Sequence, residues 1–223
     1  MIVYKPHMVR EFISQYLSDA PIIVEAGAFM GHDSIKMLQK WPNARIFALE
    51  PIPELFEKLK ERVAPYPSIV PLLCGLSDCT GTRPLHVAYK PDRPELPTQA
   101  SSLHEPFKRL EWSPIQFTKT IDIKVMTVPD LMKAYDIGTI DLLWLDLQGH
   151  ELSVLKSCEA IFSKIKLIHM EVYFDQEYKD HAYYEDVLVW LADNGFEIVG
   201  RDFVVPAKVK FGNLIIRYIT KFG

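Results

Sequence analysis

The strongest constraint on the fold of this chain is a short apolar run that ends in a glycine-bounded turn. The segment from Pro21 to Gly31 reads PIIVEAGAFMG, so three β-branched residues stand between a proline and two glycines. Such a run predicts a strand that is buried on both faces, as in a parallel sheet. A helix is predicted to begin near His32, and a second apolar strand covers residues 45–49. This strand, helix and strand order is typical of an α/β fold.

The alternation of strands and helices continues along the chain. Further strands are predicted over residues 68–76, 121–128, 140–146, 166–172, 196–199 and 214–219, the last two as an antiparallel pair at the sheet edge. Helices are predicted over residues 34–41, 53–63, 129–135, 151–162 and 184–192. The pattern predicts one doubly wound, mostly parallel α/β domain over residues 1–223, with ligands bound beyond the carboxyl ends of the strands.

Two segments stand outside this alternation. Residues 1–20 carry apolar side chains at helical spacing and predict an N-terminal helical cover. Residues 80–125 break the rhythm with many prolines, and only residues 85–89 resemble an edge strand. We interpret this second segment as an insertion or flap. Its composition fits either a plain surface loop or a lid over an acceptor.

The glycine turn distinguishes between two kinds of nucleoside cofactor. A dinucleotide fingerprint reads G-x-G-x-x-G, but Phe29 and His32 occupy the later glycine positions counted from Gly27, so NAD is disfavoured. The turn matches the acid-x-Gly-Ala-x-x-Gly form of S-adenosylmethionine loops, which would place Glu25 near the methionine amino group. Glu50 follows 23 residues after Gly27, close to the spacing of about 20 at which a carboxylate accepts hydrogen bonds from ribose hydroxyls. The alternative is an ordinary strand-to-helix turn.

Polar residues suited to chemistry follow the two central strands of the second half. Asp146 ends an apolar run, and a buried charge needs a partner, so we expect it to face the cofactor or the acceptor. His150 is a candidate general base by its intrinsic pKa, or else a surface or capping group. Glu171 could anchor an acceptor hydroxyl, or pair with a buried cation. Glu151 could simply favour the helix dipole, and His169 is more typical of a core histidine.

A metal site is weakly supported. Asp146 and Glu171 offer oxygen ligands on adjacent strand ends, which hard cations prefer, but a third ligand is not evident, so we expect no obligatory metal. The cysteines Cys74, Cys79 and Cys158 are odd in number and lack C-x-x-C spacing. They predict neither a disulfide framework nor a zinc site, and we expect reduced thiols in or near the core.

Charge and hydropathy limit the class of partner. The net charge is −4 and the basic residues are scattered, which argues against nucleic acid. No apolar run approaches the roughly 18 residues of a membrane span, and the N-terminal sequence lacks the apolar region of a signal peptide. We therefore expect a cytoplasmic protein without a membrane partner, and the oligomeric state stays open.

Several blocks along the chain together resemble the FkbM family of S-adenosylmethionine-dependent methyltransferases. The most specific is DLQGHELSVL at residues 146–155, which resembles the family's Asp-x-(Glu/Gln)-Gly-x-Glu-x-x-Val-Leu motif. The other blocks, in order, are residues 25–31, Glu50-Pro51, Ser77-Asp78, Ser101-Ser102-Leu103 and the strand-end Glu171. Glu25 replaces the family's usual Asp, and Phe29 stands where a small polar residue is common.

The resemblance implies a fold, a cofactor and an activity. The fold would be the Rossmann-like, seven-stranded sheet of class I methyltransferases, with the cofactor across the first two strands. Gly27, Ala28 and Gly31 would line the methionine and ribose portions, and Glu50 would hold the ribose hydroxyls. Ser77 and Asp78 would flank the adenine, although a capped turn explains these two residues equally well.

The implied reaction is O-methylation of a hydroxyl on a saccharide or a small-molecule natural product, with S-adenosylhomocysteine as coproduct. Asp146, His150 and Glu171 are the candidate catalytic residues. Two alternatives stay open: an N-methyltransferase, which could work without a base, and a non-catalytic cofactor-binding module in a biosynthetic complex.

Overall fold

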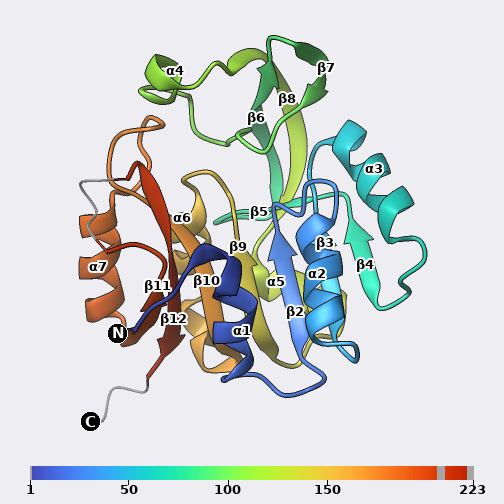
Figure 1. Ribbon diagram of the computed structural model, residues 1–223, viewed down its shortest axis with the longest axis vertical. Helices are drawn as coiled ribbons and strands as arrows, with labels where there is room; N and C mark the ends of the chain where they lie inside the picture. The colour runs from blue at the N-terminus through green and yellow to red at the C-terminus, as the bar shows by residue number, and fades with distance from the viewer. Residues whose placement is uncertain (1, 205–208, 220–223) are drawn as a thin grey trace.

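An eight-stranded sheet forms the centre of the computed structural model, which describes residues 2–204 and 209–219 (Figure 1). Its strands are β1 (Ile2–Val3), β2 (Ile22–Ala26), β3 (Arg45–Leu49), β4 (Ile69–Leu72), β9 (Ile140–Leu145), β10 (Ile165–Tyr173), β11 (Phe196–Arg201) and β12 (Phe211–Tyr218). They lie in the order β1-β11-β12-β10-β9-β2-β3-β4. Strand β12 is antiparallel to both of its neighbours, and the other pairs are parallel.

The predicted doubly wound α/β fold is confirmed, with one strand more than the seven expected. The additional strand β1 pairs in parallel with β11 at the sheet edge. Two exposed residues carry no readable hydrophobic period, so the sequence pattern does not reveal such a strand. The sheet order reverses between β2 and β9, and in open α/β sheets ligands bind at this kind of switch point.

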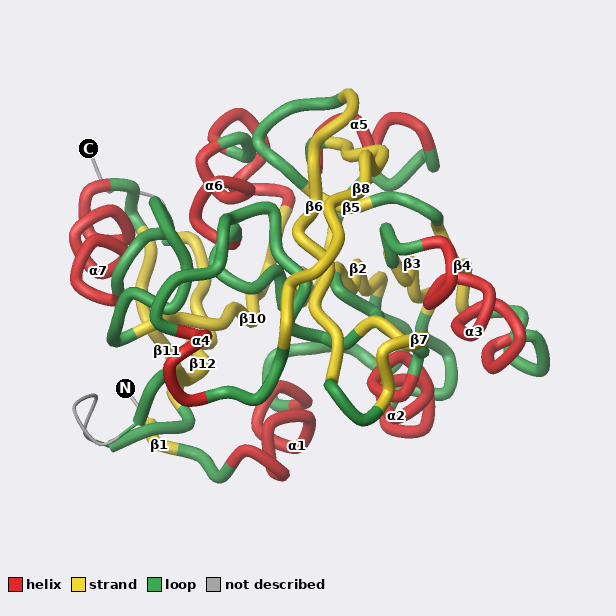
Figure 2. The backbone as a smooth tube through the Cα atoms, turned by 90° about the horizontal axis from the view of Figure 1, so that it is seen from above, coloured by secondary structure: helices red, strands yellow, loops and turns green. Residues whose placement is uncertain are grey.

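Helices cover both faces of the sheet, as the view from above shows (Figure 2). One face carries the 3-10 helix η1 (Pro6–Met8) with α1 (Val9–Ser14), α2 (His32–Lys40) and α3 (Pro53–Val63); the other carries α5 (Val128–Ala134), α6 (Glu151–Lys156) and α7 (Tyr184–Asp193). Alternate residues of each buried strand pack into the two cores; on β9, Leu143 belongs to one and Leu142 to the other.

The helix predicted over residues 151–162 is shorter than expected. It ends at Lys156 and is followed by a 3-10 helix, η2 (Glu159–Lys164). The hydroxyl of Ser157 and the thiol of Cys158 both donate to the carbonyl oxygen of Val154, at 2.7 and 3.3 Å. Such side-chain bonds compete with the regular helix pattern and account for its early end.

The segment 80–125 is more regular than expected, because together with the short strand before it this segment forms a second sheet, in which the strands predicted at 85–89 and 121–128 are parts of longer strands. Its strands are β5 (Gly75–Leu76), β6 (Gly81–Lys90), β7 (Arg93–Pro97) and β8 (Gln116–Met126), in the order β5-β8-β6-β7, with a short helix α4 (Arg109–Trp112). The strand predicted over 68–76 is divided between β4 and β5. Many side chains of β6 and β8 are exposed, so the sequence shows no clear hydrophobic alternation for these strands. Figure 1 shows this sheet standing above the carboxyl ends of β2 and β3.

All three cysteines carry free thiols, and burial raises the pKa of Cys74 to about 11 and that of Cys158 to about 12. Among the helices of the described residues, none combines the length and the apolar character that crossing a membrane requires.

Candidate active site

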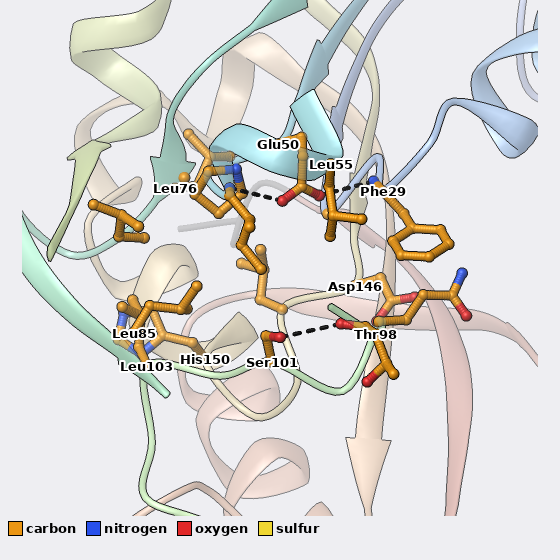
Figure 3. A pocket seen from close by; sticks show the side chains of 17 residues that line it. Phe29, Glu50, Leu55, Leu76, Leu85, Thr98, Ser101, Leu103, Asp146 and His150 are labelled. Carbon is orange, nitrogen blue, oxygen red and sulfur yellow. Dashed lines mark hydrogen bonds between the residues drawn. The ribbon is translucent and has the colours of Figure 1, made fainter. Parts of the chain in front are cut away.

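A cavity lies beyond the carboxyl ends of β2, β3 and β9, beneath the second sheet (Figure 3). Its walls are mostly apolar. The first sheet and its loops contribute Gly27, Phe29, Glu50, Pro51, Ile52, Leu55, Asp146, Leu147 and His150. The second sheet and its connections contribute Gly75, Leu76, Leu85, Thr98, Gln99, Ser101, Leu103 and Ile123. The insertion therefore roofs a cavity whose polar side chains come both from the strand ends and from the insertion itself.

Glu50 holds the glycine loop in place at the edge of this cavity. Its two carboxylate oxygens accept hydrogen bonds from the backbone N–H groups of Phe29, at 3.0 Å, and Ile52, at 2.9 Å. Phe29 has a φ of +52°, a left-handed conformation that non-glycine residues rarely adopt. Burial raises the pKa of Glu50 to about 8, although the two backbone bonds oppose the shift. Each oxygen keeps a second lone pair for a ligand hydroxyl.

The two glycines of the loop are each required, but for different structural reasons. Gly27, with φ +86°, lies so close to the end of β9 that a Cβ would sit 2.1 Å from the backbone oxygen of Asp146. Gly31, with φ +77°, packs against α3, and a Cβ there would lie 2.7 Å from Leu59. Gly27 lines the cavity, whereas Gly31 and the buried Ala28 are not among its lining residues.

Glu25 lies beneath the loop and is also not among the lining residues. Its carboxylate accepts a hydrogen bond from the hydroxyl of Ser34 on α2. Burial raises the pKa of Glu25 to about 8, against the effect of the Ser34 bond. The position expected for a contact with the methionine amino group therefore supports the packing of α2 on the sheet.

A hydrogen-bonded chain joins Ser77 to the cavity wall. The Ser77 hydroxyl donates to Asp78 at 2.9 Å and contacts Nε2 of His150 at 3.0 Å, while Nδ1 of His150 lies 3.1 Å from Nε2 of His104. Burial and the neighbouring His104 lower the pKa of His150 to about 4. Both ring nitrogens of His150 thus have a hydrogen-bond partner. Of these four hydrogen-bonded residues, only His150 lines the cavity. Ser77 and Asp78 stand behind it.

A cluster of hydrogen-bonded polar side chains lies at the ends of β9 and β10. Gln148 Nε2 donates to Asp146 at 2.7 Å and to Glu171 at 3.1 Å, so one amide bridges the two carboxylates. The Tyr173 hydroxyl also donates to Glu171. Burial, then the charges of Asp146 and Glu151, raise the pKa of Glu171 well above its usual range. Burial likewise raises the pKa of Asp146.

Glu151 has a supporting role. Its carboxylate accepts the backbone N–H groups of Leu147, at 2.7 Å, and Gly149, at 3.0 Å, which fixes the turn that carries Gln148. Gln148 itself has a φ of +53°. Two residues of the site carry no sequence signal of their own. The hydroxyl of Tyr178 donates to Gln148 Oε1 at 3.0 Å from 30 residues away, and His104 contacts His150. No local spacing predicts either contact; only the adjacent Ser-Ser-Leu block marks His104.

Within residues 2–204 and 209–219, no group of three or more His, Cys, Asp or Glu side chains is arranged to hold a metal ion.

Comparisons with known protein families and with individual proteins identify the same family. The family described as "Methyltransferase FkbM domain" matches residues 25–198. The 2-O-methyltransferase NoeI of Sinorhizobium fredii is 26% identical over 169 residues, which cover 75% of this chain and 69% of that protein. The methyltransferase sdnD of Sordaria araneosa is 32% identical over 163 residues, covering 64% of this chain and 62% of that protein.

A solved structure shares the fold. The methyltransferase FkbM from Methylobacillus flagellatus superposes with a TM-score of 0.59 at 16% identity, over 97% of this chain and 48% of that chain. At this level of identity the likeness concerns the fold alone.

Proposed function

The chain belongs to the FkbM methyltransferase family, and from that premise we propose that it transfers a methyl group from S-adenosylmethionine to a hydroxyl of a saccharide or another small molecule. The relative NoeI is a 2-O-methyltransferase, which supports oxygen as the acceptor atom. The observation that carries the proposal is the cavity itself, whose mostly apolar lining includes the carboxyl groups of Glu50 and Asp146.

The residues of this cavity fit the methyl donor. Apolar side chains such as Leu76, Leu85 and Ile123 offer a dry surface for adenine, and the carboxylate of Glu50 retains acceptor capacity for ribose hydroxyls. Asp146 also lines the cavity, and its carboxylate suits the cationic part of the donor. When bound, S-adenosylmethionine supplies an electrophilic methyl group and leaves as the neutral thioether S-adenosylhomocysteine.

We propose Glu171 as the base, because Gln148 joins its carboxylate to that of Asp146, which lines the cavity. As an acceptor oxygen forms its bond to the methyl carbon, the hydroxyl proton must leave, and a carboxylate with a raised pKa accepts it more readily than an ordinary one. Gln148 and Tyr173 orient this carboxylate. His150, with its pKa lowered to about 4 and both ring nitrogens engaged, is a weaker base and serves to shape the cavity wall.

Calorimetric titration with S-adenosylmethionine and S-adenosylhomocysteine tests the donor site. We expect micromolar binding to the wild type, weakened about tenfold or more in Glu50→Gln because an amide accepts fewer hydrogen bonds and cannot hold both Phe29 and Ile52. Glu57→Gln, on the exposed side of α3, is the matched control and should bind normally. Wild-type protein that binds neither ligand would refute the proposal.

A second variant distinguishes oxygen from nitrogen as the acceptor. Glu171→Gln should retain donor binding but slow transfer to a hydroxyl by about 100-fold, within the usual contribution of a general base. Full activity in this variant would favour an amine acceptor, since an amine can react without a base.

A further inference from the structure

The loop at residues 98–104 of the insertion has two faces. One face belongs to the wall of the donor cavity (Figure 3) and consists of Thr98, Gln99, Ser101 and Leu103. Ala100 and Ser102 are buried but are not among the cavity-lining residues. The backbone of Ser102 makes two hydrogen bonds with His86 of β6, at 2.8 and 3.1 Å. The second face of the loop is therefore held in place by the smaller sheet.

This second face meets the turn that carries Gln148. The Ser102 hydroxyl donates to the backbone oxygen of Gln148 at 2.7 Å. The Tyr178 hydroxyl lies 3.0 Å from the side-chain oxygen of Gln148 and 3.0 Å from the backbone oxygen of Ala100, so its single proton is shared between the turn and the loop. Ser102, Gln148 and Tyr178 are all buried. Loss of either hydroxyl would leave a buried oxygen of Gln148 without its donor.

Gln148 depends on such support because of its backbone conformation. Its φ of +53° is left-handed, which is uncommon for a non-glycine residue and persists where the surrounding structure imposes it. Glu151 accepts the N–H groups of Leu147 and Gly149 on either side, and Ser102 binds the carbonyl group. These three bonds together set the direction in which the Gln148 side chain leaves the turn.

We propose that Ser102 and Tyr178 are positioning residues, which hold the Gln148 amide against Asp146 and Glu171. Nε2 of Gln148 lies 2.7 Å from Asp146 and 3.1 Å from Glu171, and a hydrogen-bond donor favours the charged form of a carboxylate. This inference rests on the proposed function, in which Asp146 faces the cationic part of the donor. It gives the insertion a second role, since the loop that roofs the cavity also keeps this carboxylate pair in its charged form.

The affinities for S-adenosylmethionine and S-adenosylhomocysteine test this inference without an acceptor. The two ligands differ by one methyl group and one positive charge, so the ratio of their affinities reports the charge of carboxylates near the sulfur. In calorimetric titrations between about pH 5 and pH 9, we expect the preference for the sulfonium to rise as the pair of Asp146 and Glu171 ionises. Other groups whose charge acts on this pair are Glu25, Asp33, Arg109, Glu151, Tyr173 and Tyr178. Ser102→Ala leaves all of them in place.

Ser102→Ala should move the midpoint of this pH profile upward by about half a unit to one unit, because a displaced Gln148 amide no longer favours the charged pair. The affinity for S-adenosylhomocysteine should stay within about threefold, since Ser102 does not line the cavity. Tyr178→Phe should shift the midpoint in the same direction, and it provides the test if Ser102→Ala does not fold. Ser113→Ala, the same change on the same insertion but outside the cavity lining, should leave the profile unchanged.

A double-variant cycle shows whether Ser102 acts through Gln148. Gln148→Asn keeps a residue type that tolerates the left-handed conformation but shortens the side chain, so its amide should no longer bridge the two carboxylates. In that background Ser102→Ala should add no further shift, because the interaction that it supports is already lost.

Equal shifts in both backgrounds would overturn the inference. A lower Tm for Ser102→Ala with an unchanged pH profile would also overturn it and would assign Ser102 a structural role only. A wild-type affinity ratio that stays constant with pH would do the same while leaving donor binding intact. A wild type that binds neither ligand would refute the proposed function instead.

Discussion

At the scale of single residues, the buried carboxylates divide into those that organise the backbone and those that face a ligand. Glu50 and Glu151 each accept two backbone N–H groups and hold the two loops that flank the donor cavity. Glu25 supports α2 through Ser34. Asp146 and Glu171 share one amide instead, that of Gln148, and retain capacity for other partners. This difference in partners, more than burial alone, identifies the pair with chemistry to perform.

Glu25 gives a prediction on the pH dependence of stability. Burial raises its folded-state pKa from 4.5 to about 8, so between these values the unfolded chain releases a proton that the folded chain keeps. The free energy of unfolding should therefore fall as pH rises through this interval, by up to about 1.4 kcal/mol per pH unit from this residue. Glu25→Gln keeps an acceptor for Ser34 and removes the titration. Its stability relative to wild type should rise from about pH 5 to pH 8 in urea titrations.

The matched control for this experiment is the exposed Glu57→Gln, whose stability difference from wild type should stay constant over the same range. A Glu25→Gln difference that is equally constant would show that Glu25 is ionised in the folded protein. Comparing variants at each pH removes the opposite contribution of the buried histidines, whose lowered pKa values act in the acid range.

At the scale of elements, the β2–α2 loop is shaped by the helices as much as by a ligand. Gly31 begins α2 in a left-handed conformation, and its backbone lies against Leu59 and Val63 of α3. The glycine that sequence reasoning assigned to ligand approach is thus required for the contact of α2 with α3. Gly27 meets the end of β9 instead, and it alone of the two lines the donor cavity.

The variant Gly31→Ala distinguishes a packing role of Gly31 from a contact with the ligand. The new Cβ would strain the backbone at φ +77° and crowd Leu59, so we expect a loss of about 2 kcal/mol in the free energy of unfolding. Affinity for S-adenosylmethionine should stay within about twofold, since the residue does not line the cavity. Gly138→Ala, where a Cβ meets nothing within 4 Å, is the control and should change stability little. Lost binding with unchanged stability would show that Gly31 contacts the ligand.

The elements predictable from sequence were those whose residues carry a local signal. The apolar runs of β2, β3, β9 and β10 are buried on both faces, and their predicted bounds agree with the structure to within about two residues. Strands β6 and β8 were predicted only in part, over 85–89 and 121–128, because exposed polar residues, and Pro84 in β6, interrupt their hydrophobic period. Within the site, the roles of Glu50 and Asp146 as cavity residues could be predicted because each comes directly after a buried strand.

Contacts between distant parts of the chain have no such local signal. The bond between Ser77 and His150 joins residues 73 apart, and the stack of Trp144 on His169 depends on strand register. The direction of the Glu25 side chain is decided by the packing of α2, which no spacing within the loop records.

At the scale of the whole molecule, two sheets divide the work of enclosing the donor cavity. The large sheet supplies the polar groups at its switch point between β2 and β9, and the smaller sheet supplies much of the apolar roof.

Hydrogen exchange tests whether the insertion belongs to the donor site. Because residues 98–103 and the β6 and β8 strands contribute to the cavity wall, binding of S-adenosylhomocysteine should slow amide exchange in that part of the insertion together with the loop at 27–31. Strands β11 and β12 contribute no lining residue and serve as the internal control, with exchange unchanged. Protection confined to residues 27–31 and the end of β3 would show that the second sheet leaves the ligand uncovered, and its apolar lining would then need another explanation.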